Sequence, residues 1–137
     1  MREILFRGKR TDNGKWECGD LLSPNEFNAI PHIVYIDYLN EYGDIGEIST
    51  PVIPETVGQY TGLTDKNGKR IFEGDIVTGY FNHEKIVGYV FYGGNAQFFI
   101  QRDGIYGIGL DNSDCWLEVI SNIHDNPELL EGGEGNG

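Results

Sequence analysis

The residue types that could perform metal or thiol chemistry are few in this chain and lie far apart. They are two cysteines and three histidines: Cys18, Cys115, His32, His83 and His124. Zinc sites take four Cys or His ligands, usually visible as closely spaced pairs, and none of these residues has such a neighbour. We therefore expect no metal centre and no cofactor.

Nucleophilic catalysis and cation binding are disfavoured by spacing as well. No serine lies in a Gly-x-Ser-x-Gly motif, and the acidic residues between 37 and 47 are three or four apart, unlike the alternating ligands of a calcium loop. We interpret residues 113–116 as a turn followed by a strand with buried Cys115 and Trp116. The glycine-rich stretch 104–109 lacks a lysine, which indicates a β-bulge or tight bend and not a phosphate loop. We predict that the protein is not an enzyme.

Glu73-Gly74-Asp75 is a carboxylate motif at a strand entrance. We interpret Gly74 as adopting a backbone conformation that other residues avoid, and Asp75 as accepting hydrogen bonds from nearby backbone amides. The sequence Gly19-Asp20 repeats the motif, which favours a repeated turn device over a repeated active site.

Two Asn-Gly pairs occur in the chain. One is Asn67-Gly68, and the other, Asn13-Gly14, lies in a shorter version of the same motif. Asn67-Gly68 lies between two apolar runs and predicts a β-hairpin whose tight primed turn has positive φ at both central residues. Asn13-Gly14 predicts the turn of a first hairpin. The surrounding segments 57–77 and 11–21 repeat the order Thr-Asp, Asn-Gly-Lys and Gly-Asp.

Most of the remaining elements are predicted to be short strands. We expect them over residues 4–6, 15–22, 33–38, 74–81, 85–92, 96–102 and 115–120. The polar stretch from Asn40 to Pro54 shows no period and predicts a loop that connects an N-terminal portion to a C-terminal one. Asn126-Pro127-Glu128 predicts a short helical turn, since proline suits the first helical position.

The predicted fold is mainly β, in a single domain of 137 residues that contains 20 glycines. We expect a small antiparallel SH3-like barrel or roll over residues 57–125, with an N-terminal β-hairpin extension and loop over residues 1–56. Residues 126–137 are expected to form the helical turn and a flexible acidic tail. A larger single roll is the alternative.

The chain is strongly acidic, with 22 acidic and 10 basic residues and a net charge of −12. This balance argues against nucleic-acid binding, which depends on Lys and Arg. The exception is a basic N-terminal segment, which we interpret as charges flanking an edge strand; it contains Arg2, Arg7, Lys9, Arg10 and Lys15. Widely spaced cysteines and the lack of a long apolar segment predict a cytoplasmic protein without membrane contact.

Several long motifs lie at residues 7–10, 54–63, 65–69, 73–77 and 123–130. They resemble the motifs of the YopX family, and the resemblance extends from end to end. It implies a protein of bacterial phages and prophages with a β-rich fold and an SH3-like barrel. The family has no established biochemical function, and the resemblance therefore supplies no catalytic residues.

Aromatic residues are the remaining candidates for a binding surface. We predict that Tyr60, Tyr89, Tyr92 and Phe98 bind an unknown protein partner of host or phage, or another copy of this chain. A second hypothesis is that the acidic surface mimics DNA and occupies a nucleic-acid-binding protein. A third is direct nucleic-acid binding through the basic N-terminal segment.

Overall fold

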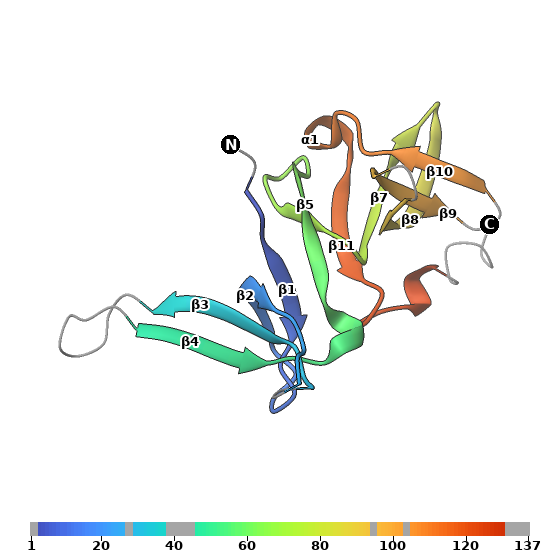
Figure 1. The fold of residues 1–137 in the computed structure, drawn as a ribbon. Coiled ribbons are helices and arrows are strands. Elements are labelled where there is room, and N and C mark those ends of the chain that lie inside the picture. Colours follow the sequence, from blue (N-terminus) through green and yellow to red (C-terminus); the bar gives the residue numbers. More distant parts are fainter. Residues whose placement is uncertain (1–2, 27–28, 38–45, 94–95, 103–104, 131–137) are drawn as a thin grey trace. The chain divides into compact units, whose positions relative to one another are not determined.

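The structure is a computed structural model that describes residues 3–26, 29–37, 46–93, 96–102 and 105–130 (Figure 1). The chain divides into two compact units, residues 1–59 and 60–137. The fold is mainly β, with every strand pair antiparallel, as predicted. Within the ranges given above, no helix is long and apolar enough to cross a membrane.

The first unit is a sheet of sequential strands in the order β4-β3-β2-β1, with the first residues of β5 (Gly58–Thr64) beside β1. The strands are β1 (Phe6–Lys9), β2 (Trp16–Leu22), β3 (His32–Asp37) and β4 (Gly46–Pro51), followed by a 3-10 helix, η1 (Pro54–Thr56). The predicted first hairpin is confirmed as β1 and β2, although β1 begins at Phe6 and not at Ile4.

The prediction of a loop from Asn40 to Pro54 is wrong for the second part of this segment. Residues 46–51 form β4, which pairs with β3 along its whole length, from Asp37 opposite Gly46 to His32 opposite Pro51. Cross-strand pairing with the β-branched residues of β3 outweighs the weak strand pattern of this segment. The pair therefore forms a hairpin inside the first unit. Residues 40–45 of the predicted loop lie outside the described residues.

After β4, the chain passes close to the backbone of β1. Val52 is fully buried, and a Cβ added at Gly8 would lie 2.9 Å from the Val52 Cβ. The Thr56 hydroxyl accepts a hydrogen bond from the Lys9 N–H (2.9 Å) and donates one to the Ile53 carbonyl (2.6 Å). The motif Arg7-Gly8-Lys9-Arg10 therefore contains a glycine because a side chain at this position would clash with Val52.

The second unit contains a five-stranded sheet in the order β10-β9-β8-β7-β11, and β5 pairs with β6. Its further elements are β6 (Arg70–Phe72), β7 (Asp75–Phe81), β8 (Glu84–Tyr92), β9 (Phe98–Arg102), β10 (Ile105–Gly109), α1 (Ser113–Trp116) and β11 (Glu118–Asn122). Helical residues follow at 128–130, which confirms the turn predicted at Asn126-Pro127-Glu128.

The core of the second unit follows from alternation along these strands. In β8, residues 86, 88 and 90 are buried while 87, 89 and 91 are half-buried. The buried apolar cluster consists of Ile71, Val77, Ile86, Val90, Ile100, Leu110, Leu117 and Val119. Phe98, Ile108 and Trp116 pack against its margin.

The closed barrel predicted for this unit is not what the structure shows. In the described part of the sheet, the end strands β10 and β11 do not pair with each other. Backbone groups at the start of β11 find other partners: the Leu117 carbonyl accepts a hydrogen bond from the Lys66 N–H (2.9 Å), and the Val119 N–H donates to the Asp65 carboxylate (2.9 Å). The hairpin turn, and not β10, therefore supplies hydrogen-bond partners at this end of β11.

Two further assignments near the open edge can be compared with the structure. The stretch 104–109 was predicted as a β-bulge or tight bend, and its described part, β10, pairs with β9 through a register shift between Ile105 and Ile108, in agreement with a bulge. Cys115 and Trp116 belong to α1 and not to a strand, and Cys115 is exposed. The buried Ser113 hydroxyl donates to the Thr64 carbonyl (2.9 Å), a tertiary contact that holds this helical turn.

The Asn-Gly hairpins are present, but their turns are not primed. Gly14 and Gly68 have φ of +71° and +81°, whereas Asn13 and Asn67 are not among the described residues with positive φ. At the second hairpin the Asp65 N–H donates to the Lys69 carbonyl (2.8 Å), which leaves a three-residue loop. Such loops combine a type I turn with a glycine in the left-handed region.

The primed geometry occurs instead at Asn82-His83, between β7 and β8, with φ of 51° and 67°. Because glycine adopts positive φ without steric cost, we expect His83→Gly to raise the free energy of unfolding by about 0.5 kcal/mol. Urea denaturation of the two proteins measures the difference. A fall in stability would mean that the histidine side chain makes a favourable contact that outweighs the backbone strain.

Candidate functional site

An open groove with a volume of about 770 Å³ lies on the second unit. It is lined by the adjoining ends of β7 and β8 with the turn between them, by β10 and the residues that follow it, and by single residues of β9 and α1. Its volume lies within the range of about 300–1,000 Å³ that is common for ligand sites. Elements from residue 80 to residue 116 thus contribute to one concave surface.

Aromatic side chains form one part of the lining. Tyr80 is 71% exposed, and the Phe81 and Trp116 rings pack at a centroid distance of 5.7 Å with a 39° angle between their planes. The Trp116 indole N–H donates a hydrogen bond to the Asp111 carbonyl (3.0 Å), which fixes the ring. The groove therefore offers aromatic surface at a defined position.

The position of Trp116 depends on a close approach between α1 and β7. A Cβ added at Gly79 would lie 2.5 Å from the Trp116 carbonyl oxygen and 2.8 Å from the indole Cε3. Only glycine allows this contact, since no neighbouring side chain end can move aside. Trp116 and Ile108 also pack against the core, so this part of the groove is continuous with the buried cluster.

Three charged side chains complete the lining: Glu84, Arg102 and Asp111. Arg102 and Glu84 lie 4.0 Å apart, at the limit of an ion pair, and their side chains are 16% and 71% exposed. Asp111 is exposed. Two accessible carboxylates therefore accompany one largely buried guanidinium.

The outer strand β10 borders the groove through Gly107, Ile108 and Gly109. In the described sheet β10 pairs with β9 alone, so its other side is a sheet edge. Two of the three residues carry no side chain of their own, although Phe99 and Phe91 pack against one face of Gly107.

The four aromatic residues predicted to bind a partner do not form one common surface. Tyr60 is 7% exposed and packs against Phe72 at 5.5 Å, inside the second unit. Tyr92 is 52% exposed and contacts Phe98 edge-on at 5.1 Å. Tyr89 is half-buried and lies on the opposite face of β8 from Tyr92, because side chains alternate along a strand. None of the four lines the groove.

Sequence reasoning did not select the groove residues Tyr80, Phe81 and Trp116. A usable signal was the aromatic pair Tyr80-Phe81 directly before the Asn82-His83 turn, since one of two consecutive side chains must face outward. Trp116 was assigned to a strand, and its helical position was not visible from its neighbours.

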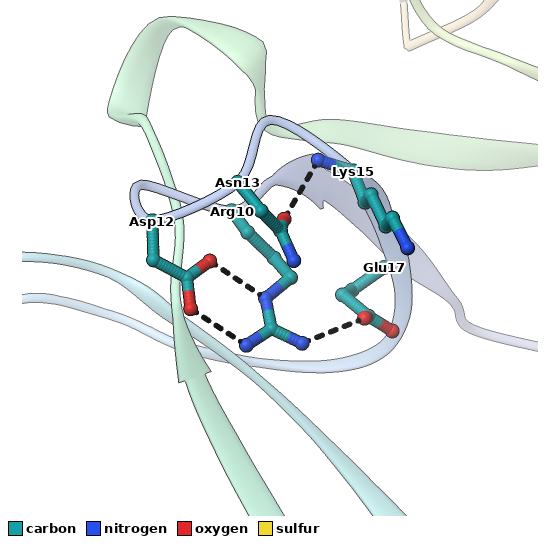
Figure 2. Close-up of polar contacts among 5 residues, drawn as sticks. All are labelled: Arg10, Asp12, Asn13, Lys15 and Glu17. Carbon is teal, nitrogen blue, oxygen red and sulfur yellow. Dashed lines mark hydrogen bonds and ion pairs between the residues drawn. The ribbon is translucent and has the colours of Figure 1, made fainter.

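The basic N-terminal segment is largely engaged within its own hairpin (Figure 2). The Arg10 guanidinium bonds both oxygens of Asp12, at 2.9 and 2.8 Å, and lies 3.3 Å from a Glu17 oxygen. These hydrogen bonds, first of all the one to Asp12, raise the pKa of Arg10, and the bond from Arg10 lowers the pKa of the Asp12 carboxyl. The Asn13 side chain accepts the Lys15 N–H (2.9 Å), which fixes the turn between them.

Two further cations of this segment lie over one aromatic ring. The Arg7 guanidinium and the Lys9 ammonium are 4.7 and 5.8 Å from the Trp16 ring centre, a cation–π arrangement. Arg2 lies outside the described residues. The hairpin thus uses Arg7, Lys9 and Arg10 in contacts of its own.

The interpretation of Gly74-Asp75 as a turn device is confirmed. Gly74 has a φ of +92°, and the buried Asp75 carboxylate accepts a hydrogen bond from the Phe72 N–H (2.7 Å). The parallel with Gly19-Asp20 is wrong, because Gly19 lies inside β2 without positive φ. A Cβ at Gly19 would clash with the Val34 carbonyl, so this glycine permits the close pairing of β2 and β3.

Asp65 is a buried carboxylate that accepts several backbone hydrogen bonds. It is 2% exposed, and it accepts backbone hydrogen bonds from Asn67, Lys69 and Val119, each at 2.9 Å. Burial alone would raise the pKa of Asp65, but these N–H groups and the charge of Lys69 lower it overall. In the part of the chain that the structure describes, no three His, Cys, Asp or Glu side chains are arranged to hold a metal ion.

Comparisons with known proteins bear on the whole chain. Residues 5–131 match the family described as YopX protein. Among solved structures, the crystal structure of protein EF1440 from Enterococcus faecalis is similar, with a TM-score of 0.61 and 26% sequence identity over 95% of this chain and 99% of that chain. No curated protein matches the sequence.

Proposed function

This chain belongs to the YopX family, as its motifs suggested, and on that premise we propose that it is a non-enzymatic phage or prophage accessory protein that binds a protein partner. The binding site is the groove of the second unit. The observation that carries the proposal is the convergence of Tyr80, Phe81 and Trp116 on one open surface. The partner belongs to the bacterial host or the phage, and the protein acts in the cytoplasm.

The composition of the groove supports binding more than chemistry. Exposed aromatic side chains bury a large area at low entropic cost and are enriched at interface hot spots. None of the described lining residues is a serine, cysteine or histidine. The polar groups present are carboxylates, a guanidinium and asparagine amides, which recognise a ligand by hydrogen bonds and charge.

As part of this proposal, the second unit is an SH3-like barrel whose sheet is open. The meander β7-β8-β9, with a short helix before the last strand, is compatible with an opened member of this class. Opening the sheet leaves β10 as an edge beside the groove, and sheet edges commonly bind extended peptides.

The proposal predicts that Tyr80→Ala strongly reduces capture of the partner. Tagged wild-type protein is incubated with lysate of the source organism, and the recovered proteins are quantified by mass spectrometry. Truncation of a hot-spot aromatic at an interface costs about 2 kcal/mol or more, so the affinity for the partner should fall about thirtyfold. Because Tyr80 is 71% exposed, the variant should keep its fold and thermal midpoint.

Tyr92→Ala is the matched control, since Tyr92 is also an exposed tyrosine of the same sheet but does not line the groove. Recovery of the partner should be unchanged. Loss of the partner by the Tyr92 variant alone would move the site to the Tyr92–Phe98 pair. Recovery of nothing beyond a tag-only control would contradict partner binding, and recovery of this chain alone would indicate self-assembly.

Acidic mimicry of DNA is the second candidate, favoured by the net charge of −12. Part of that charge is engaged internally, since Asp65 and Asp75 are buried and Asp12 is paired with Arg10. The same capture experiment at low and high salt separates the two functions. A partner held by mimicry is lost at high salt, whereas one held by aromatic contacts is retained.

A further inference from the structure

We propose, resting on the function above, that the groove binds a lysine or arginine side chain carried by an extended segment of the partner. The aromatic rings contact the cation, Glu84 and Asp111 pair with it, and the edge of β10 receives the backbone of the segment. Three independent features of the groove lead to this ligand.

The first feature is charge. Glu84 and Asp111 are accessible, whereas the side chain of Arg102 is only 16% exposed. The 4.0 Å separation between Arg102 and Glu84 leaves the Glu84 carboxylate able to accept a second cation. Since the lining presents two carboxylates against one guanidinium on a chain of net charge −12, the groove attracts positive ligands.

The second feature is the aromatic surface. A Lys or Arg head group is attracted to the face of Trp, Tyr or Phe, most strongly to Trp. The indole N–H of Trp116 already donates to the Asp111 carbonyl at 3.0 Å, so it is not available to donate to the ligand. Tyr80 adds a second accessible ring.

The third feature is the strand edge. Gly107 and Gly109 border the groove on β10, and neither places a side chain of its own beside the unpaired edge of this strand, while Phe99 and Phe91 cover one face of Gly107. A partner segment in extended conformation can pair with such an edge while its side chains alternate between the groove and solvent. An extended segment is therefore the geometry that brings one cation to the rings and its backbone to β10.

The competing ligand is a peptide whose carboxylate pairs with Arg102. An anion would have to replace Glu84 beside Arg102 and would face Asp111, so like charges would oppose it. The two ligands differ in the sign of their charge, which a direct experiment can read.

The test is a selection from a random heptapeptide library displayed on phage, with the full-length protein as bait. Selected sequences should be enriched in Lys or Arg, and representative synthetic peptides should bind with their largest amide shifts at Gly107, Gly109 and Trp116 in NMR spectra. The double variant Glu84→Gln, Asp111→Asn should weaken these peptides about tenfold, while Tyr80→Ala should abolish binding. The control Asp114→Asn removes an exposed charge from α1 that does not line the groove, and should change affinity less than twofold.

The outcomes separate this inference from the proposed function. Enrichment of acidic peptides that still require Tyr80 would overturn the cationic ligand and leave groove binding intact. Peptides that bind the Tyr80 variant as well as the wild type would overturn both. Equal loss of affinity in the Asp114 control would show that the general acidic field, and not the groove carboxylates, recognises the peptide. A selection that enriches no sequence would also overturn the inference.

Discussion

Asp65→Asn is expected to lower the free energy of unfolding by about 2–4 kcal/mol. The carboxylate is 2% exposed and accepts three backbone hydrogen bonds, two from its own hairpin and one from Val119. An asparagine amide can present only one oxygen to these donors, and its NH₂ group would face a further N–H. Buried donors would then lose their partners, which costs more than the hydrogen bonds themselves contribute.

The same substitution should flatten the dependence of stability on pH. The pKa of Asp65 in the folded protein is lowered below its usual value, so its charged form stabilises the fold. This contribution is fully present above the unfolded pKa of about 3.9 and is lost as the pH falls through the lower folded pKa. Urea denaturation between pH 7 and pH 3 should therefore show a steeper loss of stability at acidic pH for wild type than for the variant.

Asp114→Asn is the matched control, because Asp114 is an exposed aspartate of the same unit. Its stability should remain within about 0.5 kcal/mol of wild type. If Asp65→Asn were as stable as this control, the carboxylate would not be what joins the hairpin to β11. Of the two hydrogen bonds described above between the hairpin and the start of β11, the one from the Lys66 N–H to the Leu117 carbonyl would then be the one that matters.

The case of Asp65 shows where sequence reasoning succeeds and where it ends. The motif Asp65-Lys66-Asn67-Gly68-Lys69 predicts a hairpin from local turn chemistry, and the hairpin is present. The contact between Asp65 and Val119 spans 54 residues, and no local pattern indicates it. Whether the end strands of a sheet pair depends on long-range contacts of this kind, so the open sheet could not be predicted from local sequence patterns.

The candidate site was harder to predict than the fold. Most strands were identified because alternation and turn residues are local signals, as in β7 and β8. The groove joins residues that are up to 36 positions apart, from Tyr80 to Trp116, and depends on α1, which the sequence presents as the start of a strand. Tyr60 was selected for binding because it is aromatic, but packing against Phe72 buries it. Exposure is decided by tertiary contacts that composition does not contain.

Gly79→Ala is expected to have the second large effect, on both stability and binding. The added methyl group would lie 2.5 Å from the Trp116 carbonyl oxygen and 2.8 Å from the indole Cε3, so α1 must move away from β7. Forcing an extra carbon into a packed site typically costs about 1–3 kcal/mol. Because Trp116 lines the groove, the indole N–H resonance of Trp116 should shift, and capture of the partner should fall with it.

Gly109→Ala separates this steric effect from the general cost of replacing a strand glycine. At Gly109 a Cβ would meet only the Asp111 carboxylate, at the ordinary contact distance of 3.8 Å, so stability should change by less than about 0.5 kcal/mol. If the Gly79→Ala variant were as stable as wild type, α1 would be able to move away from β7 without an energetic cost. The position of Trp116 would then not be fixed by β7. A destabilised Gly79 variant with full binding would instead show that the partner contacts Tyr80 and β10 without needing the indole. Only the joint loss of stability and binding, with Gly109→Ala unaffected in stability, ties recognition to the packing of α1 against Gly79.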